Sequence, residues 1–135
     1  MIFETLDTSG HEQVVFCSNP DAGLKAIIAI HSTVLGPALG GVRMRSYVDT
    51  QAALTDALRL SRTMTYKNAL AGLNVGGGKA ILIGDPATEK TEAAFRGFGR
   101  YVDSRGGRYI TAEDMGTDVN DIENVYRETE YVVGV

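Results

Sequence analysis

The stretch NVGGGKAILIG, residues 74–84, places three consecutive glycines and Lys79 directly before a short apolar run. The run ends at Asp85-Pro86, and its length and apolar character predict a buried strand over residues 80–84. Consecutive glycines cost conformational entropy on folding, so we expect a structural or functional demand for them. Our interpretation is that a substrate approaches the bare backbone of residues 76–78, with Lys79 at the edge of that approach.

The same stretch does not match either of two nucleotide-binding motifs, the P-loop and the dinucleotide fingerprint. A P-loop requires a glycine six positions before its lysine and Ser or Thr directly after it, whereas this chain has Leu73 and Ala80 there. A dinucleotide fingerprint requires a third glycine where Ile81 stands. We therefore expect no cofactor-binding residue in the chain, whereas tight binding of ATP or NAD would favour the phosphate-site alternative.

Strand-like and helical patterns extend outward from these glycines. Residues 13–17 and 24–31 are apolar, β-branched runs separated by turn residues, which predicts a hairpin. A glycine-rich bend over residues 36–47 leads into a third strand. Residues 50–68 carry apolar side chains at three- and four-residue spacing, which predicts an amphipathic helix with Asp49 or Thr50 as its N-cap.

The C-terminal part of the chain continues the alternation. Residues 90–104 and 119–129 predict two further helices, and residues 108–111 predict a strand between them. The expected fold class is therefore α/β, with a mixed sheet flanked by helices in a single domain that covers residues 1–135. The order of the strands does not follow from this pattern.

The composition excludes several classes of partner. The 135 residues carry a net charge of −4 and no basic stripe, so we expect no nucleic acid to bind. Cys17 is the only cysteine, so no intrachain disulfide can form, and we expect a cytoplasmic protein. No apolar run has the length of a membrane span, and His11 and His31 lack the spacing of metal ligands. We expect neither a membrane nor a metal as a partner.

Two lysines and an aspartate are the candidates for chemistry. Lys67 ends the long predicted helix, Lys79 follows the glycines, and Asp114 lies between a strand and a turn, where side chains often face a cleft. In one cleft, one lysine can bind a substrate carboxylate, the other can act as a general base, and Asp114 can exchange protons. Each also has an ordinary explanation, because a lysine at a helix end is usually solvated and an acid beside Glu113 is usually on the surface.

At these residues the sequence resembles the NAD-dependent amino-acid dehydrogenases. Leucine dehydrogenases are the most similar, phenylalanine and valine dehydrogenases are close behind, and glutamate dehydrogenases are more distant. The resemblance implies the substrate-binding and subunit-pairing domain of an enzyme that deaminates leucine or another branched-chain L-amino acid oxidatively to a 2-oxo acid and ammonia. It covers essentially the whole chain and is carried by GPALGGVRM (36–44), ALRLSRTMTYKNALAGLNVGGGKAILIGDP (57–86) and GRYITAEDMGT (107–117).

The resemblance also implies roles for individual residues. Lys67 would bind the substrate carboxylate, Lys79 would activate the water that attacks the imino intermediate, and Asp114 would relay protons to and from the amino group. An apolar pocket offers no cation for the second carboxylate of glutamate. We therefore expect leucine, valine or isoleucine as the substrate rather than glutamate, and phenylalanine is excluded less strongly than glutamate. The residues that would line this pocket are Leu39, Gly40, Gly41, Met64 and Ala112.

The sequence departs from this family at three positions. Leucine dehydrogenases often have Thr, Gly and Thr where this chain has Val133, Thr63 and Asp118. The change at Val133 affects the expected preference among substrate side chains. Asp118 adds a carboxylate that would raise the pKa of Asp114, or have its own pKa raised, if the two groups lie close together.

The resemblance implies that the family's chains continue beyond the position of Val135 into an NAD-binding Rossmann domain, which we expect to be absent from residues 1–135. We therefore expect NAD to bind tightly only in the full-length enzyme, and we expect no turnover by the isolated chain. The alternative function is a stand-alone oligomerisation module without catalysis. In that case residues 13–17 and 24–31 would supply a strand edge for pairing in a homo-oligomer.

Overall fold

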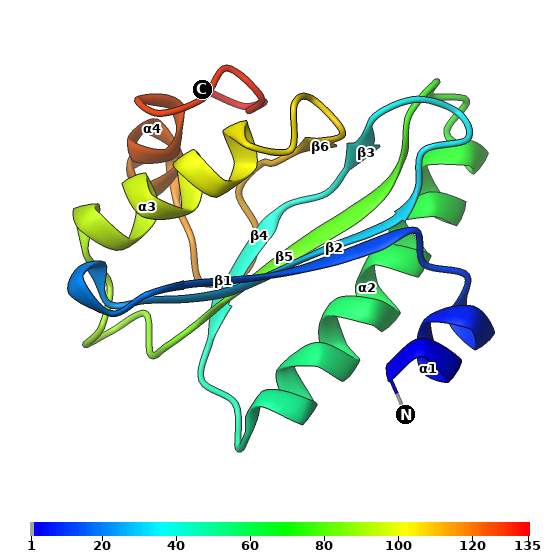
Figure 1. Ribbon diagram of the computed structural model, residues 1–135. Coiled ribbons are helices and arrows are strands. Elements are labelled where there is room, and N and C mark those ends of the chain that lie inside the picture. Colours follow the sequence, from blue (N-terminus) through cyan, green and yellow to red (C-terminus); the bar gives the residue numbers. More distant parts are fainter. Residues whose placement is uncertain (1) are drawn as a thin grey trace.

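Strand β5, Gly76–Ile83, forms the centre of a six-stranded mixed sheet in the computed structural model, which describes residues 2–135 (Figure 1). Strand β2 (Leu24–Ser32) runs antiparallel along one edge of β5. Strands β3 (Ala38–Leu39) and β4 (Val42–Arg45) run parallel along the other edge, one after the other. Seven of the eight residues of β5 are buried. The strand lacks a polar face because both of its faces are covered.

Apart from α1 and η1, the remaining elements follow the predicted order, in which strands come first and then alternate with helices. In order they are α1 (Ile2–Ser9), β1 (Gln13–Asn19), the short 3-10 helix η1 (Pro20–Ala22), β2 (Leu24–Ser32), β3 (Ala38–Leu39), β4 (Val42–Arg45), α2 (Thr50–Leu70), α3 (Glu92–Asp103), β6 (Tyr109–Ile110) and α4 (Val119–Tyr126).

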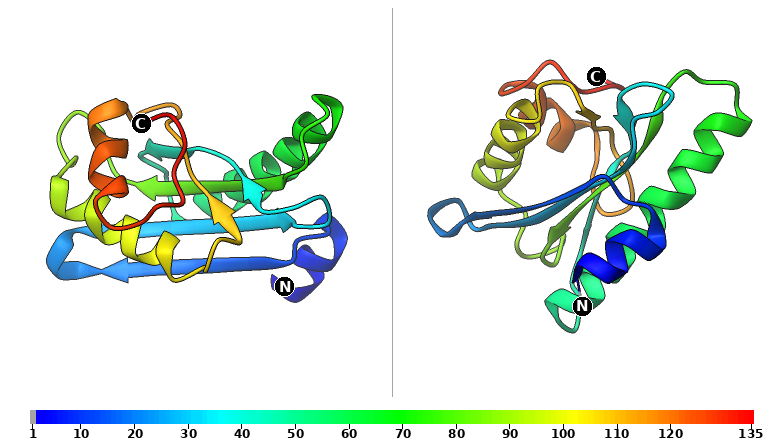
Figure 2. Two further views of the ribbon diagram at one scale, coloured as in Figure 1. Left: turned by 90° about the horizontal axis from the view of Figure 1, so that it is seen from above. Right: turned by 45° about the vertical axis from the view of Figure 1, so that its right-hand side comes forward.

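The two N-terminal strands form the predicted hairpin. They pair antiparallel from Gln13 opposite Ile30 to Asn19 opposite Leu24. The turn between them closes through η1 and Gly23, whose φ of 67° lies in the left-handed region that glycine tolerates. Strand β1 ends the sheet on this side, as the view from above shows (Figure 2).

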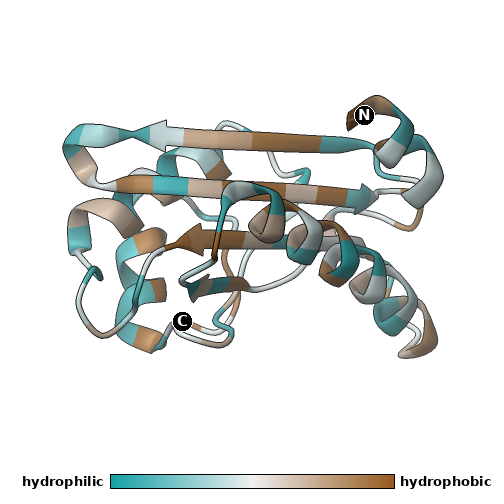
Figure 3. Cartoon of the chain, turned by 90° about the horizontal axis from the view of Figure 1, so that it is seen from below, coloured by the Kyte–Doolittle hydropathy of each residue, from teal (hydrophilic) through white to brown (hydrophobic). Residues whose placement is uncertain are grey.

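Helices cover both faces of the sheet (Figure 2), and each face has its own apolar core. Helix α2 packs against β2 and β5, where Leu54 and Leu58 meet Ile27 and Ile81. Helices α3 and α4 cover the opposite face. Their core includes Phe95, Phe98, Val102, Ile122 and Val125. Figure 3 shows apolar residues along the adjacent strands, whereas α2 alternates between apolar and polar residues.

The alternation of side chains along β5 decides which face each residue reaches. Ile81 packs in the core beneath α2, whereas Ala80 and Leu82 pack in the core beneath α3 and α4. Successive side chains of a strand point to opposite faces, so Lys79 lies on the same face as Ile81. The buried lysine is thereby directed towards α2.

The observed bounds differ from the predicted ones in a few places. The predicted helix over residues 50–68 is α2, and Asp49 is its N-cap, accepting a hydrogen bond from the backbone nitrogen of Ala52 at 2.8 Å. The strand predicted over residues 80–84 begins earlier, at Gly76, because the glycines themselves pair with β2 and β3. Helix α1 was not predicted from the sequence. None of the helices in residues 2–135 is long and apolar enough to cross a membrane.

Candidate functional site

A cleft of about 440 Å³ opens on the α2 face of the sheet, bordered by the end of α2, the bend from β3 to β4 and the segment after β6. All eight residues predicted for the site line this cleft. They are Leu39, Gly40, Gly41, Met64, Lys67, Lys79, Ala112 and Asp114. The tertiary structure therefore brings together residues from four separate parts of the sequence.

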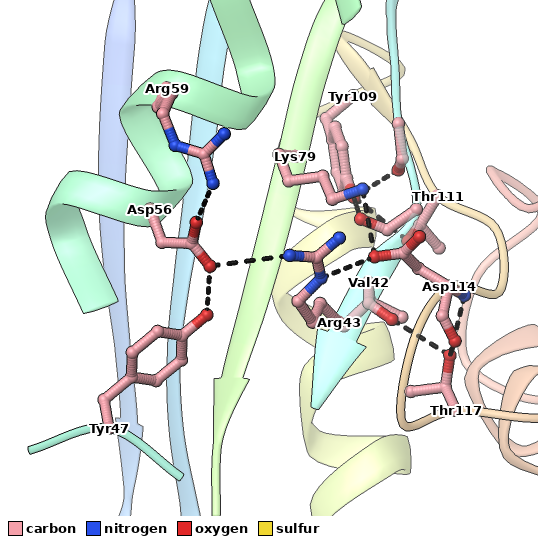
Figure 4. Close-up of polar contacts among 12 residues, drawn as sticks. Val42, Arg43, Tyr47, Asp56, Arg59, Lys79, Tyr109, Thr111, Asp114 and Thr117 are labelled. Carbon is pink, nitrogen blue, oxygen red and sulfur yellow. Dashed lines mark hydrogen bonds and ion pairs between the residues drawn. The ribbon is translucent and has the colours of Figure 1, made fainter. Parts of the chain in front are cut away.

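Lys79 lies at the floor of the cleft and is only 6% exposed. Its Nζ is 3.0 Å from Oδ2 of Asp114 (Figure 4). Transfer of an ammonium from water into a protein interior is unfavourable unless a charge or hydrogen-bond acceptor compensates it. Asp114 provides this compensation, so the pair is a structural requirement as well as a candidate for proton transfer.

The turn that follows Asp114 holds its backbone in place, and Lys79 and Arg43 contact its carboxylate. Thr117 Oγ1 accepts a hydrogen bond from the backbone nitrogen of Asp114 at 2.9 Å and lies 2.9 Å from the carbonyl oxygen of Val42. Partial burial alone would raise the pKa of Asp114, but hydrogen bonds and charges from Lys79, and then from Arg43, outweigh it. The pKa of Asp114 therefore lies below its ordinary value, and the group is a carboxylate at neutral pH.

Lys67 occupies the last turn of α2, at the mouth of the cleft. Its side chain is exposed, and it forms no ion pair with any side chain of residues 2–135. The neighbouring Asn68 is buried and donates through Nδ2 to the carbonyl oxygens of Gly76, at 2.8 Å, and Leu39, at 3.3 Å. Asn68 thereby anchors the end of α2 to β5 and β3. The Lys67 ammonium, exposed and without an ion pair to residues 2–135, is available for an anion.

The glycines of residues 76–78 do not line the cleft, so the interpretation that a substrate approaches them is wrong. A Cβ at Gly77 would lie 2.1 Å from the backbone nitrogen of Thr65, which is too short for two nonbonded atoms. Helix α2 can therefore pack this closely on β5 only because residue 77 is glycine. Gly40, which does line the cleft, faces a similar constraint, because its Cβ would lie 1.6 Å from the carbonyl oxygen of Gly78. The chain's own packing accounts for these glycines.

Five further residues line the cleft, and of these only Val133 was expected to affect the substrate: Arg43, Leu60, Thr63, Glu113 and Val133. Two of them are positions where the sequence departs from leucine dehydrogenases, and both departures thus lie beside the expected substrate. Arg43 is the most important of the five for the chemistry of the cleft, because it forms an ion pair with Asp114. Its Nε lies 3.0 Å from Oδ2 of that residue. Its place in the motif GGVRM is the only sequence signal that would have indicated it.

Asp118 does not act on the cleft in the way the sequence suggested. Its side chain accepts a hydrogen bond from the backbone nitrogen of Asp121 and caps α4. That backbone hydrogen bond is the main reason why the pKa of Asp118 is lowered, and the charge of Lys90 adds to it. The pKa values of Asp114 and Asp118 are both lowered, so the rise expected for a close approach of the two carboxylates is not observed.

The family of the chain follows from a comparison with known proteins. The model of the family described as "Glu/Leu/Phe/Val dehydrogenase, dimerisation domain" matches residues 11–131. The chain belongs to this family. The resemblance to amino-acid dehydrogenases and the α/β fold class predicted from the sequence are thereby confirmed.

Individual amino-acid dehydrogenases are similar to nearly the whole chain. Leucine dehydrogenase of Geobacillus stearothermophilus is 59% identical over 134 residues, which cover 99% of this chain and 36% of that enzyme. Phenylalanine dehydrogenase of Bacillus thermotolerans is 55% identical over 134 residues, 99% of this chain and 35% of that enzyme. The crystal structure of L-tryptophan dehydrogenase from Nostoc punctiforme matches with a TM-score of 0.94 and 50% identity, covering 98% of this chain and 39% of that one. The chain therefore spans little more than a third of the length of these relatives.

Proposed function

We propose that residues 1–135 are the substrate-binding domain of an NAD-dependent L-amino-acid dehydrogenase, which oxidises leucine or another branched-chain amino acid to its 2-oxo acid and ammonia. The observation that carries this proposal is the convergence of an unpaired lysine, a buried lysine and a carboxylate in one cleft with an apolar lining. Membership of a family whose relatives include leucine and phenylalanine dehydrogenases supports the reaction class.

Each of the three charged groups has a separate role in this proposal, which follows from its surroundings. Lys67, which has no carboxylate partner among residues 2–135, binds the substrate carboxylate at the mouth of the cleft. Lys79 at the floor activates the water that attacks the imino carbon. Asp114, whose Oδ2 lies 3.0 Å from Nζ of Lys79, exchanges protons with the substrate nitrogen. A substrate held between the two lysines would have its α-carbon beside the proton-transfer groups.

NAD would supply the hydride acceptor of this reaction. The residues described here do not fit its phosphates, because the glycine-rich stretch lies within β5 and is packed against Thr65, with no helix N-terminus following it. We therefore propose that NAD binds to a separate domain, and that the isolated chain does not turn over substrate.

Apolar side chains of the cleft favour an aliphatic substrate. Leu39, Met64 and Ala112, together with Leu60 and Val133, line it without adding a free cation. The one further cation there, Arg43, is paired with two carboxylates. The second carboxylate of glutamate would be desolvated without a partner, which is costly. We propose leucine, valine or isoleucine as substrates, and a cytoplasmic location, consistent with the free thiol of Cys17.

Calorimetric titration with 4-methyl-2-oxopentanoate tests the proposal on the 135-residue chain. The wild type should bind, and Lys67→Ala should weaken the affinity at least tenfold, because a charge-assisted contact is lost. Lys25→Ala is the matched control, since Lys25 is an exposed lysine of β2 outside the cleft. If Lys67→Ala binds as tightly as Lys25→Ala, the carboxylate role of Lys67 is wrong.

A second function, homo-oligomerisation, is favoured by the free edge of β1 and by the description of the family as a dimerisation domain. Phe16 on β1 is 55% exposed, and an exposed strand edge beside an apolar side chain is a template for pairing with a second copy. Light scattering across a wide range of concentrations should detect a dimer or larger assembly. Phe16→Lys should shift it towards monomer, and a wild type that stays monomeric throughout would remove this function.

A further inference from the structure

Arg43 lies between two carboxylates that come from different parts of the chain. Its Nε is 3.0 Å from Oδ2 of Asp114, and its Nη1 is 3.6 Å from Oδ2 of Asp56 on α2. The side chain is 15% exposed. Figure 4 shows the guanidinium extending between the two acids, with Lys79 beside it and reaching the same oxygen of Asp114.

The register of the sheet sets this arrangement. Arg43 on β4 pairs with Ile81 on β5, so its side chain emerges on the same face as those of Ile81 and Lys79. Lys79 Nζ and Arg43 Nε then approach the same atom, Oδ2 of Asp114, each at 3.0 Å. The other oxygen, Oδ1, accepts no hydrogen bond from residues 2–135 and belongs to a side chain that lines the cleft.

Asp56 holds the opposite end of the guanidinium. Its side chain is 10% exposed, and it accepts hydrogen bonds from the Tyr47 hydroxyl and, at 2.7 Å, from Arg59 Nη2. Burial alone would raise the pKa of Asp56, but these two hydrogen bonds and the charge of Arg43 lower it. Asp56 is therefore an ionised anchor fixed to α2, and a planar guanidinium can bridge it to Asp114 where an ammonium cannot.

We propose that Arg43 is a positioning residue: braced by Asp56 and Tyr47, it turns the Asp114 carboxylate so that Oδ2 is occupied by Arg43 and Lys79 while Oδ1 faces the substrate. This inference rests on the proposed function for the identity of the substrate, but the orientation of Asp114 is a property of the chain alone. A proton leaving the substrate nitrogen would bond to Oδ1, because both cations already occupy Oδ2.

Nuclear magnetic resonance on the 135-residue chain tests the proposal without turnover. The Hα–Hβ couplings of Asp114 report whether its side chain occupies one rotamer, and its carboxyl carbon shift reports its titration. In the wild type we expect one rotamer. Arg43→Met should average the couplings and raise the titration midpoint by about one pH unit, because an adjacent positive charge is removed. Arg127→Met, at an exposed arginine without an ion pair to residues 2–135, should change neither.

Two more variants separate positioning from charge and from folding. Arg43→Lys keeps a positive charge, so the titration midpoint of Asp114 should stay close to the wild-type value. The couplings should still average, because a lysine does not bridge both acids. If Arg43→Met fails to fold, Asp56→Asn removes the brace instead and should also average the couplings. Unchanged Asp114 couplings in a folded Arg43→Met or Asp56→Asn chain would overturn the proposal. Failure of the wild type to bind 4-methyl-2-oxopentanoate, with the couplings responding as expected, would overturn the proposed function alone.

Discussion

The Nζ of Lys79 lies 3.0 Å from Oδ2 of Asp114, and this ion pair joins the central strand β5 to the loop that follows β6. Because Lys79 is only 6% exposed, little water is available to replace its carboxylate partner. The same contact that prepares the cleft for proton transfer therefore also stabilises the fold.

Asp114→Asn should lower the free energy of unfolding by about 2 kcal/mol at neutral pH, because Lys79 then stays buried beside Arg43 without a counter-charge. The effect should be smaller than for a fully buried pair, because the Asp114 side chain is 25% exposed. Urea denaturation measures it, and Asp21→Asn, at an exposed aspartate without an ion pair to residues 2–135, is the control. Equal losses in the two variants would rule out stabilisation by the pair.

The same variant should change the response to acid. The pKa of Asp114 and that of Asp56 both lie below the ordinary value of 3.8. A carboxylate with a lowered folded-state pKa stabilises the fold above its unfolded pKa, and this contribution is lost as the pH falls through the folded value. The free energy of unfolding should thus decline below about pH 4, with a shallower decline in Asp114→Asn. Parallel declines in both proteins would contradict this.

His11 should remain neutral well below the ordinary pKa of histidine. Its ring nitrogens lie 2.7 Å from the hydroxyls of Ser9 and Ser61, where it links α1 to α2. Burial, and then the neighbouring charge of His31, lower the pKa of His11 to about 4. Because the unfolded chain binds a proton more readily, stability should fall as the pH drops from 6.5 towards 4. A titration midpoint for His11 near 6.5 by nuclear magnetic resonance would contradict this.

Gly77→Ala should destabilise the chain by about 3 kcal/mol, because the added methyl group would push α2 away from β5 at Thr65. Gly97→Ala is the matched control: Gly97 lies within α3, and its Cβ would meet Leu24 Cδ2 at an ordinary contact distance of 3.4 Å. That substitution should be neutral or stabilising by up to about 1 kcal/mol, since alanine favours a helix interior. Thermal denaturation compares them, and a tolerated Gly77→Ala would show that α2 can shift freely.

Leu39→Lys should change which 2-oxo acid the cleft accepts. A cation in the apolar lining should weaken binding of 4-methyl-2-oxopentanoate about tenfold, or about 1.4 kcal/mol, and permit binding of 2-oxoglutarate. Leu70→Lys is the control, because Leu70 lies on α2 outside the cleft and is 89% exposed. Identical ligand preferences in the two variants would show that Leu39 does not contact the substrate side chain.

Local pattern was sufficient to predict most elements of the fold. The period of the apolar residues predicted α2, and Asp49 was among its two candidate caps, because helix geometry and capping depend on neighbours in sequence. The hairpin of β1 and β2 followed in the same way from its turn residues. Strand order did not follow, because the pairing of β5 with β2, β3 and β4 depends on contacts between segments far apart along the chain.

The sequence by itself determined the class of fold, and through its motifs the family and a set of candidate site residues. Only the tertiary structure decided that Lys79 faces α2 and that Arg43 reaches Asp114. It also decided that Thr65 and other parts of the chain, rather than a ligand, occupy the space beside residues 76–78. The physical reason is the register of parallel strands. It aligns Arg43 with Ile81 and so places two cations on one face, a relation that spacing along a single strand does not contain.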